Sequence, residues 1–119
     1  MAESALDQSE LLDGNQVMLW AWLAVANGDT GAPVKIANFA DMTVTIDGTF
    51  GVGGSCTFQG SNDGTNWYAL TDPQGNAITK TAASMEQVTE APRYVRPSVT
   101  AGDGTTAIDI RLVARRGAR

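Results

Sequence analysis

The sequence predicts an all-β protein, built as a single antiparallel β-sandwich of about eight short strands with a jelly-roll or an immunoglobulin-like strand order. Several runs alternate between apolar and polar residues, as half-buried strands do. The 13 glycines fall mostly between apolar runs, where they indicate turns. A length of 119 residues with 43% hydrophobic and 18% charged residues indicates one domain with a real core, and excludes a wholly disordered chain.

Residues 1–15 are polar and acidic and end in a turn signal, Asp13-Gly14-Asn15. We expect them to form a flexible N-terminal arm with one short helical turn around residues 9–12, and residues 16–119 to form the sandwich. The arm contains four acids and no base, whereas residues 111–119 contain four arginines and no acid. These ends are either two solvated segments or complementary surfaces on neighbouring copies.

Residues 16–26 are the first predicted strand, and a short buried helix is the competing interpretation. In an extended chain Met18, Trp20 and Trp22 share one face, and the aliphatic residues between them share the other. A strand that is apolar on both faces is expected to be covered on both. One face can supply the core, and the tryptophan face then needs a loop or a partner to cover it.

The remaining strands are separated by turn clusters rich in glycine, asparagine and aspartate. They are predicted at residues 33–39, 42–50, 55–60, 66–70, 77–81, 84–90 (a strand or a bent loop), 93–100 and 107–115. Pro97 cannot donate a ladder hydrogen bond, so the strand containing it should lie at a sheet edge or carry a bulge there. In the last strand the alternation places Ile108, Ile110, Leu112 and Ala114 inside.

The sequence offers no catalytic or cofactor-binding residues. It has no histidine, and its one cysteine, Cys56, lies in an apolar strand pattern and is expected to be buried. Loop oxygens of Asn62, Asp63, Asp72 and Asp103 could bind calcium, but turns closed by their own side chains explain them equally simply. We therefore predict no enzyme, no cofactor and no metal.

Net charge and hydropathy limit the classes of partner that this chain is expected to bind. Only eight lysines and arginines against 13 acids, a net charge of −5, argue against nucleic-acid binding. The longest apolar run, residues 17–26, is too short to cross a bilayer as a helix, so we expect no membrane partner. The acidic first residues lack a signal-peptide pattern and the chain cannot form an internal disulfide, so we expect synthesis in the cytoplasm.

The hairpin sequence FQGSNDGTNW (58–67), with APRYVR (91–96) downstream, resembles part of discoidin-like, galactose-binding-like domains. That resemblance implies a sandwich in which Asn62, Asp63 and Gly64 close a hairpin and Trp67 packs across it. The resemblance does not imply sugar or lipid binding by this chain, because the binding loops of those domains have no counterpart in its sequence.

A longer stretch, from about residue 44 to 115, is similar to small β-sandwich virion proteins of tailed bacteriophages. The hairpin is followed in order by DPQGNAIT (72–79), PRYVRPSV (92–99), GDGTT (102–106) and a final strand. The resemblance implies a head decoration (cement) protein on the capsid surface, made in the bacterial host cytoplasm. Its expected partners are the major capsid protein and copies of itself, as a dimer or trimer.

Under this hypothesis, an interface would use aromatic, apolar and arginine side chains, which are enriched where proteins meet. The candidates are Met18, Trp20, Trp22, Arg111, Arg115, Arg116 and Arg119. The alternative is that both tryptophans belong to the core. A different function, a carbohydrate-binding module of a receptor-binding or tail apparatus, would instead expose Trp67 and Tyr68 on a flat face.

Overall fold

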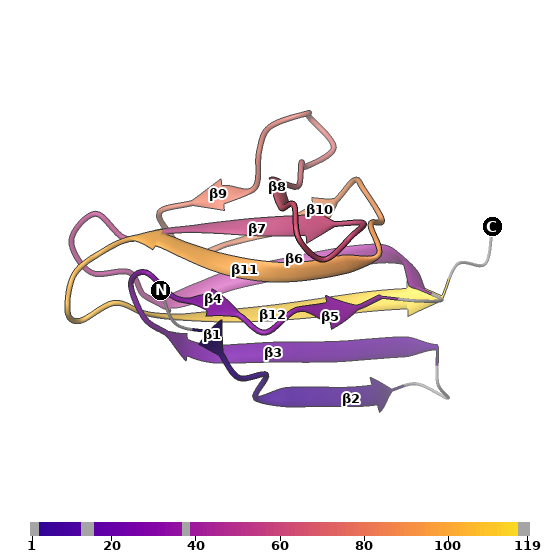
Figure 1. Cartoon of the computed structure of the whole chain (residues 1–119), viewed down its shortest axis with the longest axis horizontal. Coiled ribbons are helices and arrows are strands. Elements are labelled where there is room, and N and C mark those ends of the chain that lie inside the picture. Colours follow the sequence, from indigo (N-terminus) through magenta and orange to yellow (C-terminus); the bar gives the residue numbers. More distant parts are fainter. Residues whose placement is uncertain (1–2, 13–15, 37–38, 117–119) are drawn as a thin grey trace.

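The computed structural model describes residues 3–12, 16–36 and 39–116, and within them it contains twelve strands and no helix. Two sheets dominated by antiparallel pairing pack together as a sandwich, which confirms the predicted fold class (Figure 1). No helix long and apolar enough to span a membrane occurs in the described part of the chain.

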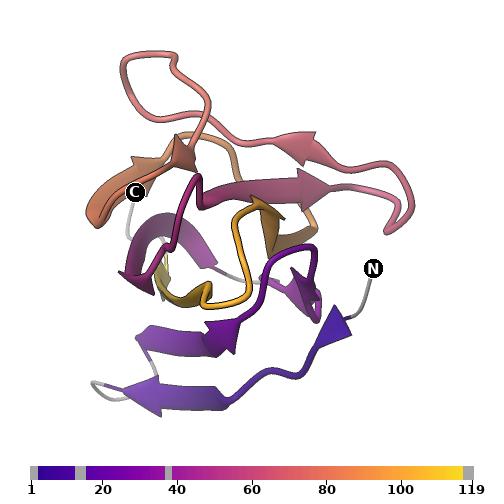
Figure 2. The ribbon, with the colours of Figure 1, turned by 90° about the vertical axis from the view of Figure 1, so that its left-hand side faces the viewer.

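The five-stranded sheet, called here sheet B, is antiparallel throughout. Its order is β10-β6-β12-β3-β2, so the C-terminal strand lies at its centre. The strands are β2 (Gln8–Leu12), β3 (Val17–Val25), β6 (Phe39–Thr49), β10 (Ser84–Val88) and β12 (Ala107–Arg116). Figures 1 and 2 both show β2 running beside β3 at one margin of the sheet.

The seven-stranded sheet, sheet A, is built from shorter pieces around a β7–β11 pair. Its main order is β1-β4-β11-β7-β8, with β5 also on β11 and β9 also on β7. The strands are β1 (Glu3–Ser4), β4 (Thr30–Gly31), β5 (Val34–Lys35), β7 (Ser55–Ser61), β8 (Tyr68–Ala69), β9 (Thr79–Lys80) and β11 (Tyr94–Ala101).

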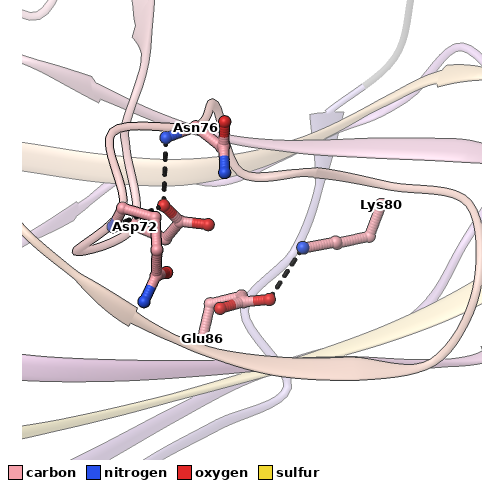
Figure 3. A network of polar contacts seen from close by, with 5 residues as sticks. Asp72, Asn76, Lys80 and Glu86 are labelled. Atoms are coloured by element: carbon pink, nitrogen blue, oxygen red, sulfur yellow. Dashed lines mark hydrogen bonds and ion pairs between the residues drawn. The ribbon is translucent and has the colours of Figure 1, made fainter.

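The core lies between the inward faces of the two sheets. The predicted alternation of the last strand is confirmed, since Ile108, Ile110, Leu112 and Ala114 are all buried. Opposite them, sheet A contributes a second set of fully buried side chains, Cys56, Phe58, Val95 and Val99. At one open margin the sheets are linked by an ion pair at 2.7 Å between Lys80 of β9 and Glu86 of β10 (Figure 3).

Strand β3 contains a bulge that the sequence pattern does not indicate. Ile110 pairs with Trp22 and Ile108 with Val25, so Leu23 and Ala24 together oppose the single residue Asp109. Ala24 adopts a left-handed conformation with φ of 55°. Such a bulge changes the alternation of the strand. Val25 therefore joins Trp20 and Trp22 in the core, although strict alternation assigns it to the opposite face.

The N-terminal segment differs from the expected arm. Residues 8–12 form β2, paired with β3 along five residues, and Glu3–Ser4 pairs with β4, so the predicted helical turn is wrong. An exposed edge strand needs no apolar alternation, and QSELL shows none, which explains why the pattern was not detectable. The predicted turn Asp13-Gly14-Asn15 lies outside the described residues.

Each of the predicted strands overlaps a strand of the structure, and the additional three strands of the described residues are β1, β2 and β4. Pro97 is a correction, because it lies neither in an edge strand nor at a bulge. It pairs with Phe58 of β7 on one side, and on the other side it faces the gap between β5 and β4. The neighbouring strand is interrupted where proline offers no N–H, so the ladder loses nothing there.

Candidate interaction surfaces

The hairpin turn between β7 and β8 is closed by Asp63. Its carboxylate accepts hydrogen bonds from the backbone N–H groups of Thr65 (2.8 Å) and Asn66 (2.9 Å), and from the side chains of Asn66 and Ser61. These donors hold the pKa of Asp63 well below its usual range, the backbone bond from Asn66 contributing most. Gly64 has φ of 78°, a conformation that suits glycine. Asp63 and Gly64 thus shape this turn through these bonds and this backbone conformation.

The other hairpin residues complete the turn. The side-chain oxygen of Asn62 accepts the backbone N–H of Arg93 at 3.0 Å and so ties the turn to the start of β11. Trp67 is half-buried, and the Arg96 guanidinium lies 4.1 Å from its ring centroid. Arg96 also donates to the side chain of Gln59 on β7. Arg96 of β11 therefore covers one face of the Trp67 ring.

The other two loop carboxylates also bond to backbone N–H groups, Asp72 within its own turn and Asp103 both within its turn and to another loop. Asp72 accepts the N–H groups of Gln74 and Asn76, both at 3.0 Å (Figure 3). Asp103 accepts the N–H groups of Val52 and Thr105, which lowers its pKa from 3.8 to about 2. The described residues hold no group of three or more metal-ligating side chains. Local turns account for these hydrogen bonds except the bond from Val52, which joins the loop of Asp103 to the loop after β6.

A depression of about 520 Å³ lies beside the same hairpin, between the β7–β8 turn and the connection from β10 to β11. Its lining includes Asn62, Asp63, Tyr68 and Glu90. Tyr68 is 70% exposed and offers a free aromatic surface at this place. The Glu90 carboxylate accepts two hydrogen bonds from Thr71. Its burial would raise its pKa, but these bonds outweigh that effect and lower it.

The outer face of sheet B has no layer over it within the described chain. Arg111, Val113 and Arg115 alternate with the buried residues of β12 and therefore point outward. The register places Ala21, Leu19 and Val17 of β3 opposite these three residues, and Gln8, Glu10 and Leu12 of β2 beyond them. We call this array the β3 face: Gln8, Glu10, Leu12, Val17, Leu19, Ala21, Leu23, Arg111, Val113 and Arg115.

The β3 face has an apolar centre and charged flanks of opposite sign. Leu23 is 39% exposed and Leu19 is half-buried, whereas Ala21 is shielded between its larger neighbours. On one flank Arg111 and Arg115 are exposed, and Arg111 forms a loose ion pair with Asp47 at 3.5 Å. The opposite flank presents the exposed Glu10, which accepts a hydrogen bond from Gln8.

The predicted interface residues divide between core and surface. Trp22 is fully buried and Trp20 nearly so, as the core alternative expects, and we assign neither to an interface. Met18 packs partly buried against the same core. Trp20 makes an edge-to-face contact with Phe39, whose ring lies 5.0 Å from the Arg116 guanidinium.

Of the remaining candidates, Arg111 and Arg115 are surface residues of the β3 face, and Arg119 lies outside the described residues. Glu10, Leu19 and Leu23 lie on the same face as these arginines and were not among the predicted interface residues. The apolar character of both faces of residues 17–25 was a usable signal, because one of the two faces had to remain outside the core. The sequence pattern does not indicate which of the two faces remains outside the core.

Cys56 is a core residue, as expected. It is fully buried, and burial raises its pKa to about 12, with a backbone hydrogen bond at Ser98 opposing this in part. A thiol of that kind is a poor nucleophile at neutral pH because almost none of it is ionised.

Neither the scan of family models nor the search of curated proteins finds a match for this chain. Among solved structures, the SPBc2 prophage-derived protein YomS superposes with a TM-score of 0.62 and 13% identity, over 82% of this chain and 93% of that one. The protein NMB1881 from Neisseria meningitidis gives a TM-score of 0.42 and 11% identity, over 92% and 84%, an overlap too weak to inform the argument. The chain therefore shares the β-sandwich fold of YomS.

Proposed function

We propose that this chain is a structural protein of a bacteriophage particle that binds and stabilises the capsid shell as a decoration protein. The observation that carries the proposal is the fold shared with a prophage-derived protein along nearly all of that protein's length. The ordered series of motifs from the hairpin to the last strand, similar to virion sandwiches, supports it. In this proposal the chain works through protein–protein contacts, with the major capsid protein and with copies of itself, and it has no catalytic role.

Two features of the fold, its bonded loops and its apolar outer face, suit a protein that decorates a capsid. Side-chain-to-backbone bonds at Asp63, Asp72 and Asp103 hold the loops in place. The β3 face supplies apolar surface with charges around it, the composition typical of protein interfaces. A decoration protein needs both features, because it must persist outside the cell and must adhere to a shell.

Cosedimentation with purified empty shells of the encoding phage tests the proposal. The expected result is saturable binding, with a plateau at a fixed ratio of this chain to the shell protein, and raised thermal stability of the shell. Binding that rises linearly without a plateau, or no binding, would contradict it.

A second candidate is carbohydrate binding by a tail or receptor-binding module, favoured by the depression beside Tyr68. An exposed aromatic ring next to amide and carboxylate groups is the usual composition of a sugar site. Tyr68 would be the stacking ring, because Arg96 already covers a face of Trp67. A glycan array with the wild-type chain and Tyr68→Ala tests this: a specific signal lost in the variant supports it, and a blank array contradicts it.

A further inference from the structure

We propose that two copies of this chain associate through their β3 faces about a two-fold axis that runs along β3. The inference deepens the assembly function proposed above and rests on its claim that the chain binds copies of itself. It names the surface, the symmetry and the charged groups that would pair.

The apolar centre of the face gives the first argument. Val17, Leu19, Ala21 and Leu23 follow one another on the outward side of β3, with Leu12 and Val113 beside them. Antiparallel sheets that face water usually alternate apolar-in with polar-out, and β3 does not. Val17 and Ala21 are already buried within this stripe, whereas Leu19 and Leu23 remain partly exposed, and this exposed part is the surface that a partner would cover.

The positions of the charged side chains favour a second copy of this chain as the partner of the face. A two-fold axis along β3 places β3 over β3 of the other copy, and β12 of each copy over β2 of the other. Glu10 pairs in register with Leu19, which pairs with Val113, and Val113 stands between Arg111 and Arg115 on β12. Each Glu10 would thus lie between the two arginines of the opposite copy, about 7 Å along the strand from each, within reach of an arginine side chain.

These charged groups are available for such pairing. Arg115 and Glu10 take part in no ion pair within the described residues, and the ion pair of Arg111 with Asp47 is long and half-exposed. A face whose acidic and basic flanks lie on opposite sides of its apolar centre is self-complementary under a two-fold axis. Isologous dimers require that property of a surface.

The face gives a small interface. Only β12, β3 and β2 overlap under this axis. Three strands about 4.8 Å apart and nine residues at about 3.3 Å each give roughly 430 Å² per copy, about half of the ~800 Å² of a standard interface, so we expect a weak dimer. Asp47 and Asp109 lie beyond the Arg111 row, at one end of the face, where the acidic groups of the two copies would repel. The contact is therefore centred on the Leu19 row.

A charge-swap experiment on the full chain tests the proposal by sedimentation velocity. The wild type is expected to sediment at twice its 12.5 kDa mass. Glu10→Arg makes the flanking charges all positive, and Arg111→Glu with Arg115→Glu makes them all negative. Each variant alone should dimerise more than about tenfold more weakly, and an equimolar mixture of the two should recover a dimer.

Arg93→Glu is the matched control, because Arg93 is an exposed arginine at the start of β11, outside the β3 face, and this variant should remain dimeric. Circular dichroism confirms that each variant folds. A dissociation constant of about 100 µM is weak for a protein interface. A wild type that stays monomeric up to this concentration would overturn the proposal. So would either swap variant that dimerises alone as the wild type does, or a mixture that stays monomeric. Shell binding by a monomeric wild type would reject this interface and leave the capsid function standing, whereas a confirmed dimer that ignores shells would do the reverse.

Discussion

The indole N–H of Trp22 donates a hydrogen bond to the backbone carbonyl of Ala32 at 2.9 Å. Trp22 lies in the middle of β3 in sheet B, and Ala32 connects β4 to β5 in sheet A. The bond therefore joins the two layers at the place where the strand beside Pro97 is interrupted. It also satisfies the polar atom of the largest fully buried side chain, which a tryptophan in a core requires.

Trp22→Phe should destabilise the protein by about 2–4 kcal/mol, because it removes this bond, leaves a carbonyl without its partner and vacates part of the ring volume. Urea unfolding followed by circular dichroism measures the change. Trp67→Phe is the control, since Trp67 is only half-buried, and it should cost less. Equal costs for the two variants would contradict the assignment of Trp22 to the layer contact.

Gly31 allows Trp22 and Pro97 to approach the backbone. A Cβ at Gly31 would lie 2.6 Å from Cδ of Pro97 and 2.7 Å from Cδ1 of Trp22. Gly31→Ala should therefore cost about 1–3 kcal/mol through overpacking. Gly104→Ala, where a Cβ would meet nothing within 4 Å, should be nearly neutral in the same urea assay. If both substitutions are neutral, the close packing at Gly31 is not present in solution.

The bulge in β3 predicts a stabilising substitution. Ala24 has φ of 55°, which is unfavourable for a residue with a Cβ, and its N–H is held by Asp109 at 2.8 Å. Ala24→Gly should raise the free energy of unfolding by about 0.5–1 kcal/mol, because glycine adopts this conformation without the steric penalty. Ala69→Gly, in the ordinary strand β8, should lower it by a similar amount. A loss of stability in Ala24→Gly would show that the bulge is not formed.

The hydrogen bonds of the Asp103 carboxylate should make the free energy of unfolding fall in acid. Its pKa is lowered from 3.8 to about 2 in the folded chain, so its contribution is complete above pH 4 and is lost as the pH falls toward 2. Asp103→Asn removes the titration. The urea midpoint of the wild type should fall more steeply between pH 4 and 2 than that of the variant. Parallel curves for the two proteins would show that Asp103 does not carry these bonds.

Cys56 should be unreactive in the native protein. Its burial and its raised pKa predict that a thiol reagent at pH 8 modifies it only in concentrated guanidinium chloride. A Met85→Cys variant is the control, because Met85 is 66% exposed and a cysteine there should react at once. Fast labelling of native wild type would mean that the core opens locally.

The sequence was sufficient for the fold class because alternation is a direct record of burial on one side of a strand. β12 shows it clearly: Ile108, Ile110 and Leu112 are inside, and Arg111 and Arg115 are outside. It was insufficient for β3, where both faces are apolar and only the opposing sheet decides which one is buried.

Two further features depend on tertiary pairing. The bulge at Leu23 and Ala24 arises where β3 meets Asp109 of β12, and β2 exists because β3 offers it an edge. Neither has a local signature, since an exposed edge strand needs no apolar pattern. The surface formed by Glu10, Leu19 and Arg115 therefore became visible only through the register of three strands.

The central claim is that this chain is part of a phage particle. Quantitative mass spectrometry of particles purified from the encoding host, combined with gold labelling by an antibody against the chain, tests it most directly. The account predicts the chain at a fixed ratio to the major shell protein, with gold over the head. Absence of the chain from purified particles, with the protein found only in the cell extract, would contradict the account.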